Sequence, residues 1–144
     1  MLNKQLIFTD LDLDTKEKVF ETVIQKAIDL NLVSDLQPVL KGLFERESLL
    51  STAVGNGIAM PHCKSQSVNQ PFIAFVRLKE AMLWDEEEVT LVIFIIIPEH
   101  VDSNVHLKTL AKISKKLIHQ SFIDQLNTEN KETIYTYLKE ALEG

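Results

Sequence analysis

Apolar residues recur every three or four positions in the stretch that follows the acidic residues near the N-terminus. This spacing puts them on one face of a helix, so the pattern predicts a helix from Asp14 to Leu30. Asp14 is the expected N-cap, because Glu17 then occupies the capping-box position. The expected buried face consists of Val19, Phe20, Val23, Ile24, Ala27 and Ile28.

A second helix is expected to follow Ser34 or Asp35 and to end near Arg46 or Glu47. Pro38 suits its first turn, where a missing backbone N–H breaks no helical hydrogen bond. The residues expected to face inward are Val39, Leu40, Leu43 and Phe44. The chain therefore begins with helices before its pattern changes.

Strands are expected next. Phe72–Leu78 and Thr90–Ile97 have the composition of strands, and the second range is almost entirely apolar and rich in Val and Ile. Such a run is typical of a strand that is covered on both faces by helices. A shorter buried strand is expected at Ile58–Met60, where Pro61 stops it.

Helical spacing returns at Val105–Leu117, with Asp102 or Ser103 as the N-cap. A short segment at Phe122–Leu126 and a last helix at Lys131–Leu142 complete the chain. This order predicts an α/β (α+β) fold, a layered domain in which a mixed β-sheet is flanked by helices on both faces. No repeat or linker-like tract divides the chain, so residues 1–144 are expected to form one domain.

Composition narrows the class of protein. With 45% hydrophobic and 25% charged residues among 144, the chain is typical of globular rather than disordered proteins. Its longest apolar run, Val92–Ile97, is far shorter than the ~20 residues that span a bilayer, and no secretory signal opens the chain. A net charge of -6 argues against nucleic-acid binding, and a single cysteine fits a reducing compartment. The expected location is the cytoplasm.

The segment from Arg46 to His62 holds the residues best suited to chemistry. Two of only four glycines flank an asparagine there, and glycine lets backbone N–H groups approach an anion closely. Pro61 then sets the direction in which His62 leaves the loop, so that the imidazole is both fixed and accessible. The expected phosphate-binding donors are Ser51, Thr52, Gly55, Asn56 and Gly57.

Taken alone, a Gly-Asn-Gly turn near a histidine also fits an ordinary turn with an incidental surface histidine. The third glycine of a dinucleotide-binding fingerprint is absent, and no Gly-Lys-Ser/Thr follows as a P-loop requires. The short motif by itself therefore does not decide between a phosphate site and a simple turn.

The longer string resembles the type-2 EIIA domains of the phosphotransferase system, the fructose- and mannitol-type EIIA family. That family has an Arg-Glu pair, a Ser-Thr or similar dipeptide, a Gly-x-Gly-Ile/Val-Ala stretch and Pro-His, in this order. Here these are Arg46-Glu47, Ser51-Thr52, Gly55-Asn56-Gly57-Ile58-Ala59 and Pro61-His62. The pattern continues at Pro71, Trp84, Pro98, His106-Leu107 and Leu110-Ala111, so the resemblance covers essentially the full chain.

The resemblance implies a phosphotransferase component with a phosphohistidine intermediate. It implies that the domain accepts a phosphoryl group from the histidine-containing phosphocarrier protein and passes it to a cysteine of an EIIB domain, which phosphorylates a sugar during uptake. The phosphorylated histidine corresponds to His62, the second active-site histidine to His106 and the arginine to Arg46. Nε2 of His62 is the nitrogen expected to carry the group. No cofactor or metal is expected, and the membrane is involved only indirectly, through the sugar permease.

The side chains at these positions suit that chemistry. An imidazole with an ordinary pKa of about 6.5 is largely neutral and nucleophilic near neutral pH. Phosphorylation adds about two negative charges, for which Arg46 offers a rigid fork of donors. His106 falls in the first turn of its helix if Ser103 is the cap. That positive helix end favours phosphate and disfavours a protonated ring, so His106 is expected to be a neutral donor.

Other features have simpler interpretations. Asp10, Asp12 and Asp14 resemble the opening of a calcium loop, but Thr15 stands where the loop needs glycine, and a solvated strand end is the favoured reading. Cys63 next to His62 is poorly placed for chelating a metal and has no evident base to activate it. A carrier also needs an exposed apolar rim for its partners; the candidates, which also fit core packing, are Leu49, Leu50 and Met60.

Two other functions stay open at this point. One is a regulatory EIIA-like module, in which the phosphorylation state of His62 controls a partner such as a transporter or transcription factor. The other is a small domain that binds a phosphate-bearing metabolite without covalent chemistry. The sugar is also open, because sugar choice lies mainly in the membrane component.

Overall fold

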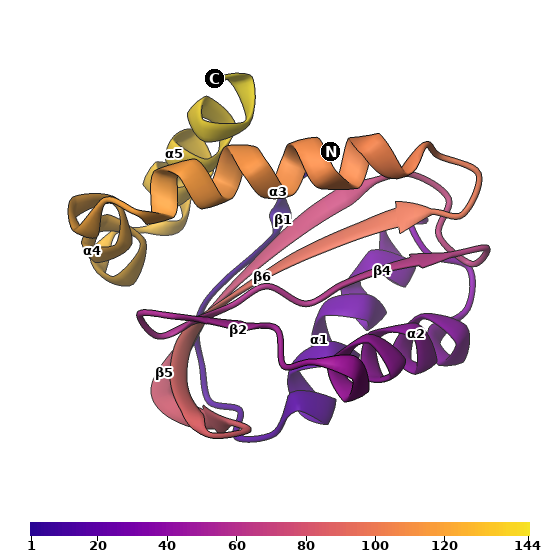
Figure 1. The fold of residues 1–144 in the computed structure, drawn as a ribbon, viewed down its shortest axis with the longest axis horizontal. Coiled ribbons are helices and arrows are strands. Elements are labelled where there is room, and N and C mark those ends of the chain that lie inside the picture. The colour runs from indigo at the N-terminus through magenta and orange to yellow at the C-terminus, as the bar shows by residue number, and fades with distance from the viewer.

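A six-stranded mixed sheet runs through the centre of the molecule, and five helices cover its two faces (Figure 1). The computed structural model describes residues 1–144. The strands are β1 (Leu2–Leu11), β2 (Ala53–Gly55), β3 (Ile58–Ala59), β4 (His62–Ser65), β5 (Phe72–Trp84) and β6 (Glu87–Pro98). The helices are α1 (Lys16–Asp29), α2 (Leu36–Leu49), α3 (Ser103–Leu117), α4 (Gln120–Thr128) and α5 (Lys131–Glu143). The predicted α/β class, with helices on both faces of a mixed sheet, is confirmed.

The sheet is built around the antiparallel hairpin of β5 and β6. β1 pairs in parallel with β5 on one side, and on the other side both β3 and β4 pair in parallel with β6. β3 lies beside Leu91 and Val92, whereas β4 begins further along, with His62 opposite Ile95. The two short strands are therefore successive pieces of one line beside β6, separated by Met60 and Pro61.

The predicted burial of β6 on both faces is also confirmed, because successive side chains of a strand point to opposite faces. In Figure 1, α1 and α2 cover one face of the sheet, while α3, α4 and α5 cover the other. The β6 residues that join the core under α1 and α2 are Val92, Phe94 and Ile96. Those that join the core under α3, α4 and α5 are Leu91, Ile93 and Ile95.

Several local expectations need correction. Thr15, not Asp14, caps α1, because its hydroxyl accepts the backbone N–H of Lys18 at 3.1 Å while Asp14 forms an ion pair with the Lys18 ammonium. α2 continues to Leu49, beyond the expected end. Phe44, expected inside, lies at the edge of the core and is 38% exposed.

The strand content was underpredicted. β1, β2 and β4 are short or lie beside a single neighbour, so they lack the apolar run that marks β6. Pro61 ends β3 as expected, but the chain returns to the sheet at once, so that His62 begins a strand instead of following one into a loop. This continuation holds the backbone of His62 against β6.

Candidate active site

His62 is held by a hydrogen bond at each of its ring nitrogens. Nδ1 lies 2.9 Å from the carbonyl oxygen of Met60, and Nε2 lies 3.1 Å from Nε of Arg46. An arginine only donates and a carbonyl oxygen only accepts. Nδ1 therefore carries the proton, and the lone pair of Nε2 faces the guanidinium. In this tautomer, Nε2 is the nucleophilic nitrogen.

Arg46 reaches this position from the last turn of α2. Its Nη1 donates to the carbonyl oxygen of Leu50 at 2.6 Å, while its Nε donates to His62. α2 packs along β4 here, where a Cβ added to Gly42 would make an ordinary contact with the Cβ of Cys63, 3.5 Å away. The guanidinium is thus fixed between its own helix end and the histidine ring.

His106 comes from the first turn of α3, on the opposite face of the sheet from α2. Asp102 caps this helix by accepting the backbone N–H of Asn104 at 2.9 Å, as one of the two expected caps. The rings of His62 and His106 lie 4.5 Å apart between centroids and are tilted by 49°. Nε2 of His106 is buried and has no hydrogen-bond partner. A buried polar atom without a partner is costly, so this nitrogen is poised to bind a group placed beside His62.

Both imidazoles are poor bases in this setting. Burial lowers the pKa of His62, and the positive charge of Arg46 adds to this effect, while the hydrogen bond to Met60 and the charge of Glu47 oppose it. Burial lowers the pKa of His106 to about 4, and the nearby side chains of His62, Arg46 and Lys64 act in the same direction. His106 is therefore neutral near neutral pH, as expected, and burial is the largest cause.

The two histidines and the arginine line one pocket of about 650 Å³. Its lining residues are Gly42, Glu45, Arg46, Ser48, Leu49, His62, Cys63, Lys64 and His106. Lys64 was not singled out from the sequence, although it follows His62 by only two residues; its Nζ donates to the hydroxyl of Ser103 at 3.1 Å. The pocket therefore combines a neutral nucleophile with two cationic side chains.

The expected apolar rim is only partly present. Leu49 and Leu50 are 82% and 72% exposed, and Leu107 beside His106 is 60% exposed. Met60 is 3% exposed, so of its two possible roles core packing is the correct one. The reason is that Met60 links two strands of the sheet, where its side chain packs under α3, α4 and α5.

The structure does not bring the other predicted donors to His62. Gly55, Asn56 and Gly57 form the turn between β2 and β3, and the turn's Gly55 and Asn56 line a separate hollow of about 190 Å³ beside the end of α3. Ser51 accepts the backbone N–H of Ala53 at 3.2 Å. Thr52 is buried, and its hydroxyl donates to Glu47. The phosphate-binding role of these five residues stays a prediction.

Cys63 lies next to His62 in sequence but points into the core under α2. Burial raises the pKa of its thiol to about 12, so the thiolate that a nucleophile requires is not formed near neutral pH. Asp10 of the supposed calcium loop is instead paired with Arg77 at 3.1 Å. Neither feature adds a reacting group to the pocket.

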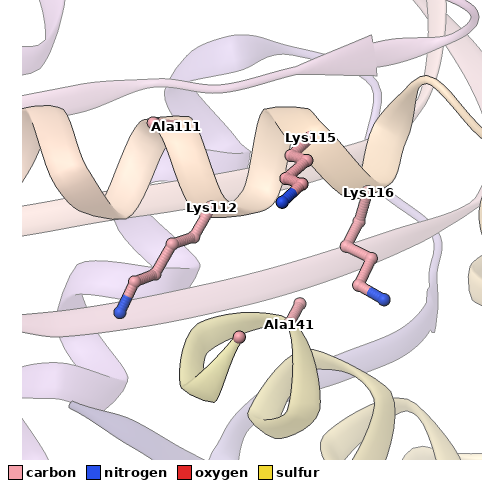
Figure 2. Close-up of a pocket in the computed structure, with 6 residues that line it drawn as sticks. Ala111, Lys112, Lys115, Lys116 and Ala141 are labelled. Carbon is pink, nitrogen blue, oxygen red and sulfur yellow. The ribbon is translucent and has the colours of Figure 1, made fainter.

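A second hollow, of about 320 Å³, lies between α3 and the end of α5. Figure 2 shows the side chains of Lys112, Lys115 and Lys116 extending from α3 toward the last turn of α5. Lys112 Nζ donates to the carbonyl oxygen of Leu142 at 2.9 Å. A cation at a helix C-terminus offsets its partial negative charge, so Lys112 has a structural role that needs no ligand.

Comparison with known proteins identifies the family. Residues 1–141 match the family model described as phosphoenolpyruvate-dependent sugar phosphotransferase system, EIIA 2. The chain is 33% identical to the PTS system fructose-specific EIIA component of Haloferax volcanii, over 90% of this chain and 86% of that protein. No helix of the structure has the length and apolar character needed to cross a membrane.

Solved structures show the same fold. The nitrogen regulatory protein IIA-Ntr of Neisseria meningitidis superposes with a TM-score of 0.87 at 28% identity, over 95% of each chain. Enzyme IIAMTL of Escherichia coli, solved in a complex with phosphorylated enzyme IIBMTL, superposes with a TM-score of 0.80 at 21% identity, over 97% of this chain and 99% of that one. The family match over nearly the whole chain shows that this protein belongs to the EIIA type-2 family of the phosphoenolpyruvate-dependent sugar phosphotransferase system.

Proposed function

We propose that His62 carries a phosphoryl group on Nε2, accepting it from the histidine-containing phosphocarrier protein and passing it to a cysteine of an EIIB domain during sugar uptake. The observation that carries this proposal is the hydrogen bonding of the His62 ring. The Met60 carbonyl holds the proton on Nδ1, which leaves the Nε2 lone pair in the pocket beside Arg46.

The transfer consists of two displacements at phosphorus. In the first, the Nε2 lone pair forms a bond to phosphorus as the nitrogen–phosphorus bond of the donor's phosphohistidine breaks, and the donor imidazole keeps that electron pair. Nδ1 of His62 stays protonated, and the Met60 carbonyl stabilises the positive charge that the ring gains. In the second, a cysteine thiolate of the acceptor forms the sulfur–phosphorus bond, and Nε2 recovers its lone pair.

The charges around the pocket suit the phosphorylated state. A phosphoryl group brings about two negative charges. Arg46 meets them with guanidinium donors, and Lys64 adds a second cation from β4. We further propose that Nε2–H of His106 donates to a phosphoryl oxygen, because this nitrogen has no partner in the unphosphorylated protein. Nε–H of Arg46 occupies the Nε2 lone pair in the unphosphorylated protein, so it leaves this nitrogen as the nitrogen–phosphorus bond forms and then donates to a phosphoryl oxygen.

A regulatory role is the second candidate, and one comparison favours it. The protein of Neisseria meningitidis, with the higher TM-score of the two structures described above, is named a nitrogen regulatory protein. In that case His62 would be phosphorylated in the same way, but the phosphorylation state would control the binding of another protein. Either role places the protein in the cytoplasm, where the phosphate donor is found.

The test is intact-mass measurement after incubation with phosphoenolpyruvate, enzyme I and the histidine phosphocarrier protein. We expect wild type to gain one phosphoryl group that is lost in acid and kept in base, and His62→Ala to gain none. His100→Ala is the matched control, because His100 is exposed and does not line the pocket. A wild-type protein that gains no mass would contradict the proposal, and transfer from phosphorylated protein to an EIIB domain separates sugar uptake from regulation.

A further inference from the structure

We propose that Glu47 is a positioning residue for His62, whose buried carboxylate fixes both hydrogen bonds of the imidazole ring. In the sequence, Glu47 stands out only as half of an Arg-Glu pair. In the structure its side chain is 5% exposed and does not line the pocket of His62. Its expected effect on phosphoryl transfer rests on the proposed function, whereas its effect on the ring can be measured without any partner protein.

The carboxylate of Glu47 accepts hydrogen bonds from four donors. Oε2 lies 3.2 Å from Lys16 Nζ, 3.2 Å from Trp84 Nε1 and 3.3 Å from the backbone N of Thr52, and Oε1 accepts the hydroxyl of Thr52. Trp84 is fully buried at the end of β5, and Lys16 begins α1. The carboxylate is therefore anchored to two elements on one side and holds Thr52 on the other.

One route leads from Glu47 to Nδ1 of His62. Glu47 binds both the N–H and the hydroxyl of Thr52, and the carbonyl oxygen of Thr52 accepts the N–H of Met60 at 2.9 Å. The carbonyl oxygen of Met60 then accepts Nδ1–H of His62. The carbonyl that selects the tautomer is thus tied to Glu47 through a single intervening residue.

A second route leads to Nε2. Arg46 precedes Glu47 in the last turn of α2, and its Nη1 is bound to the carbonyl oxygen of Leu50. Leu50 belongs to the short connection whose far end, Thr52, is held by Glu47. Fixing this connection fixes the acceptor of Nη1, and with it the direction in which Nε donates to His62. Both partners of the ring therefore depend on one carboxylate.

The first measurement is ¹⁵N NMR of the histidine rings in the unphosphorylated protein. Glu47→Gln keeps the shape of the side chain but places an NH₂ group among hydrogen-bond donors. We expect wild type to show a single Nδ1–H tautomer of His62, and Glu47→Gln to show a mixture of tautomers with faster solvent exchange at Nε–H of Arg46. The matched control is Glu132→Gln, because Glu132 is an exposed carboxylate paired with Lys4.

The second measurement is the rate of phosphorylation in a double-mutant cycle. We expect Glu47→Gln to slow the reaction by about 10- to 100-fold, in keeping with the effect of a small misplacement of reacting groups. We also expect its effect to be much smaller in an Arg46→Ala background, because part of its action passes through Arg46. If Glu47→Gln does not fold, Thr52→Val is the alternative variant, because it removes only the hydroxyl donor. Thr52→Ser keeps the hydroxyl and is expected to restore the rate.

Opposite results would overturn the proposal. If the His62 tautomer and the Arg46 exchange rate are unchanged in Glu47→Gln and in Thr52→Val, Glu47 only stabilises the fold. Fully multiplicative effects of Glu47→Gln and Arg46→Ala on the rate would likewise contradict action through Arg46. If wild type is not phosphorylated at all, the proposed function fails, but the tautomer measurement still decides the role of Glu47.

Discussion

At the scale of single residues, the imidazole rings of His62 and His106 differ in their hydrogen bonding. His62 has a partner at each nitrogen, so its tautomer is set, whereas Nε2 of His106 has none. Burial makes the neutral form the stable one for both rings, since a charged imidazole loses its hydration there. The proposed phosphoryl group on His62 would weaken this preference for His106 by placing negative charge beside it.

We therefore predict that the pKa of His106 is about 4 in the unphosphorylated protein and higher after phosphorylation of His62. The physical reason is that the added charge offsets the burial that disfavours the imidazolium. NMR titration of the two states measures both values. An unchanged pKa of His106 in the phosphorylated protein would mean that its ring does not contact the phosphoryl group.

The same depressed pKa predicts how stability depends on pH. As pH falls from about 6.5, the unfolded chain protonates His106 first, so the folded state loses stability until pH about 4, where the folded state also takes up the proton. His106→Gln removes this contribution and leaves that of His62, whose lowered pKa acts with the same sign. Urea midpoints at about pH 7 and about pH 4.5 are expected to differ less in the variant than in wild type. An equal difference would contradict the prediction.

At the scale of elements, the backbone conformation of the turn between β2 and β3 accounts for its glycines without a ligand. Gly55, Asn56 and Gly57 have φ values of 92°, 57° and 78°, a region that side chains with a Cβ enter at a cost. The carbonyl oxygen of Gly57 accepts the N–H groups of Thr90 and Leu91. The turn thus joins the antiparallel pair of β2 and β3 to β6, at the end of β3 that lies away from His62.

We predict that Gly57→Ala lowers the free energy of unfolding by roughly 1–2 kcal/mol through the left-handed backbone alone. The added Cβ would lie 3.5 Å from the Thr90 hydroxyl, an ordinary contact, so steric overlap does not contribute. Urea unfolding measures the loss, and the phosphorylation rate of the folded variant is expected to match wild type. A large loss of rate would instead support the phosphate-binding role predicted from the sequence.

At the scale of the whole molecule, Arg77 connects three segments that are distant in sequence. From β5, its Nε and Nη2 bind the carboxylate of Asp10, and its Nη1 donates to the carbonyl oxygens of Leu126 and Glu129 at 3.1 and 2.7 Å. The guanidinium therefore ties the end of α4 to the sheet. It lies outside the pocket of His62, so its role is structural.

Arg77→Met is predicted to lower the free energy of unfolding by about 1–3 kcal/mol, because it leaves buried carbonyl groups without donors. Hydrogen exchange is expected to quicken first in α4, where the lost bonds end. Asp10→Asn is the milder comparison, since it leaves the two carbonyl contacts intact. Equal stability of Arg77→Met and wild type would show that water replaces the lost donors.

Periodicity predicted much of the fold because it reflects which face of an element is buried. The apolar run of β6 predicted a strand covered on both faces, and the spacing in α1 and α3 predicted both helices. β4 was not predicted, and only the acidic end of β1 at Asp10 was, since the place of both strands depends on the strands that they pair with. The cap at Thr15 was missed because adjacent polar residues compete for the same N–H groups.

The sequence by itself predicted the order of the main elements, because local spacing reflects which face of each element is buried. Its resemblance to the EIIA family, carried by motifs spread along the chain, pointed to the family and to the three side chains that share the pocket. Only the tertiary structure decided which ring nitrogen of His62 holds the proton, how far the pKa of His106 falls, and that Glu47 binds Lys16 and Trp84 while the glycine turn lies elsewhere. These properties depend on burial and on contacts between residues far apart in the chain. Such contacts exist only once the helices have packed on the sheet.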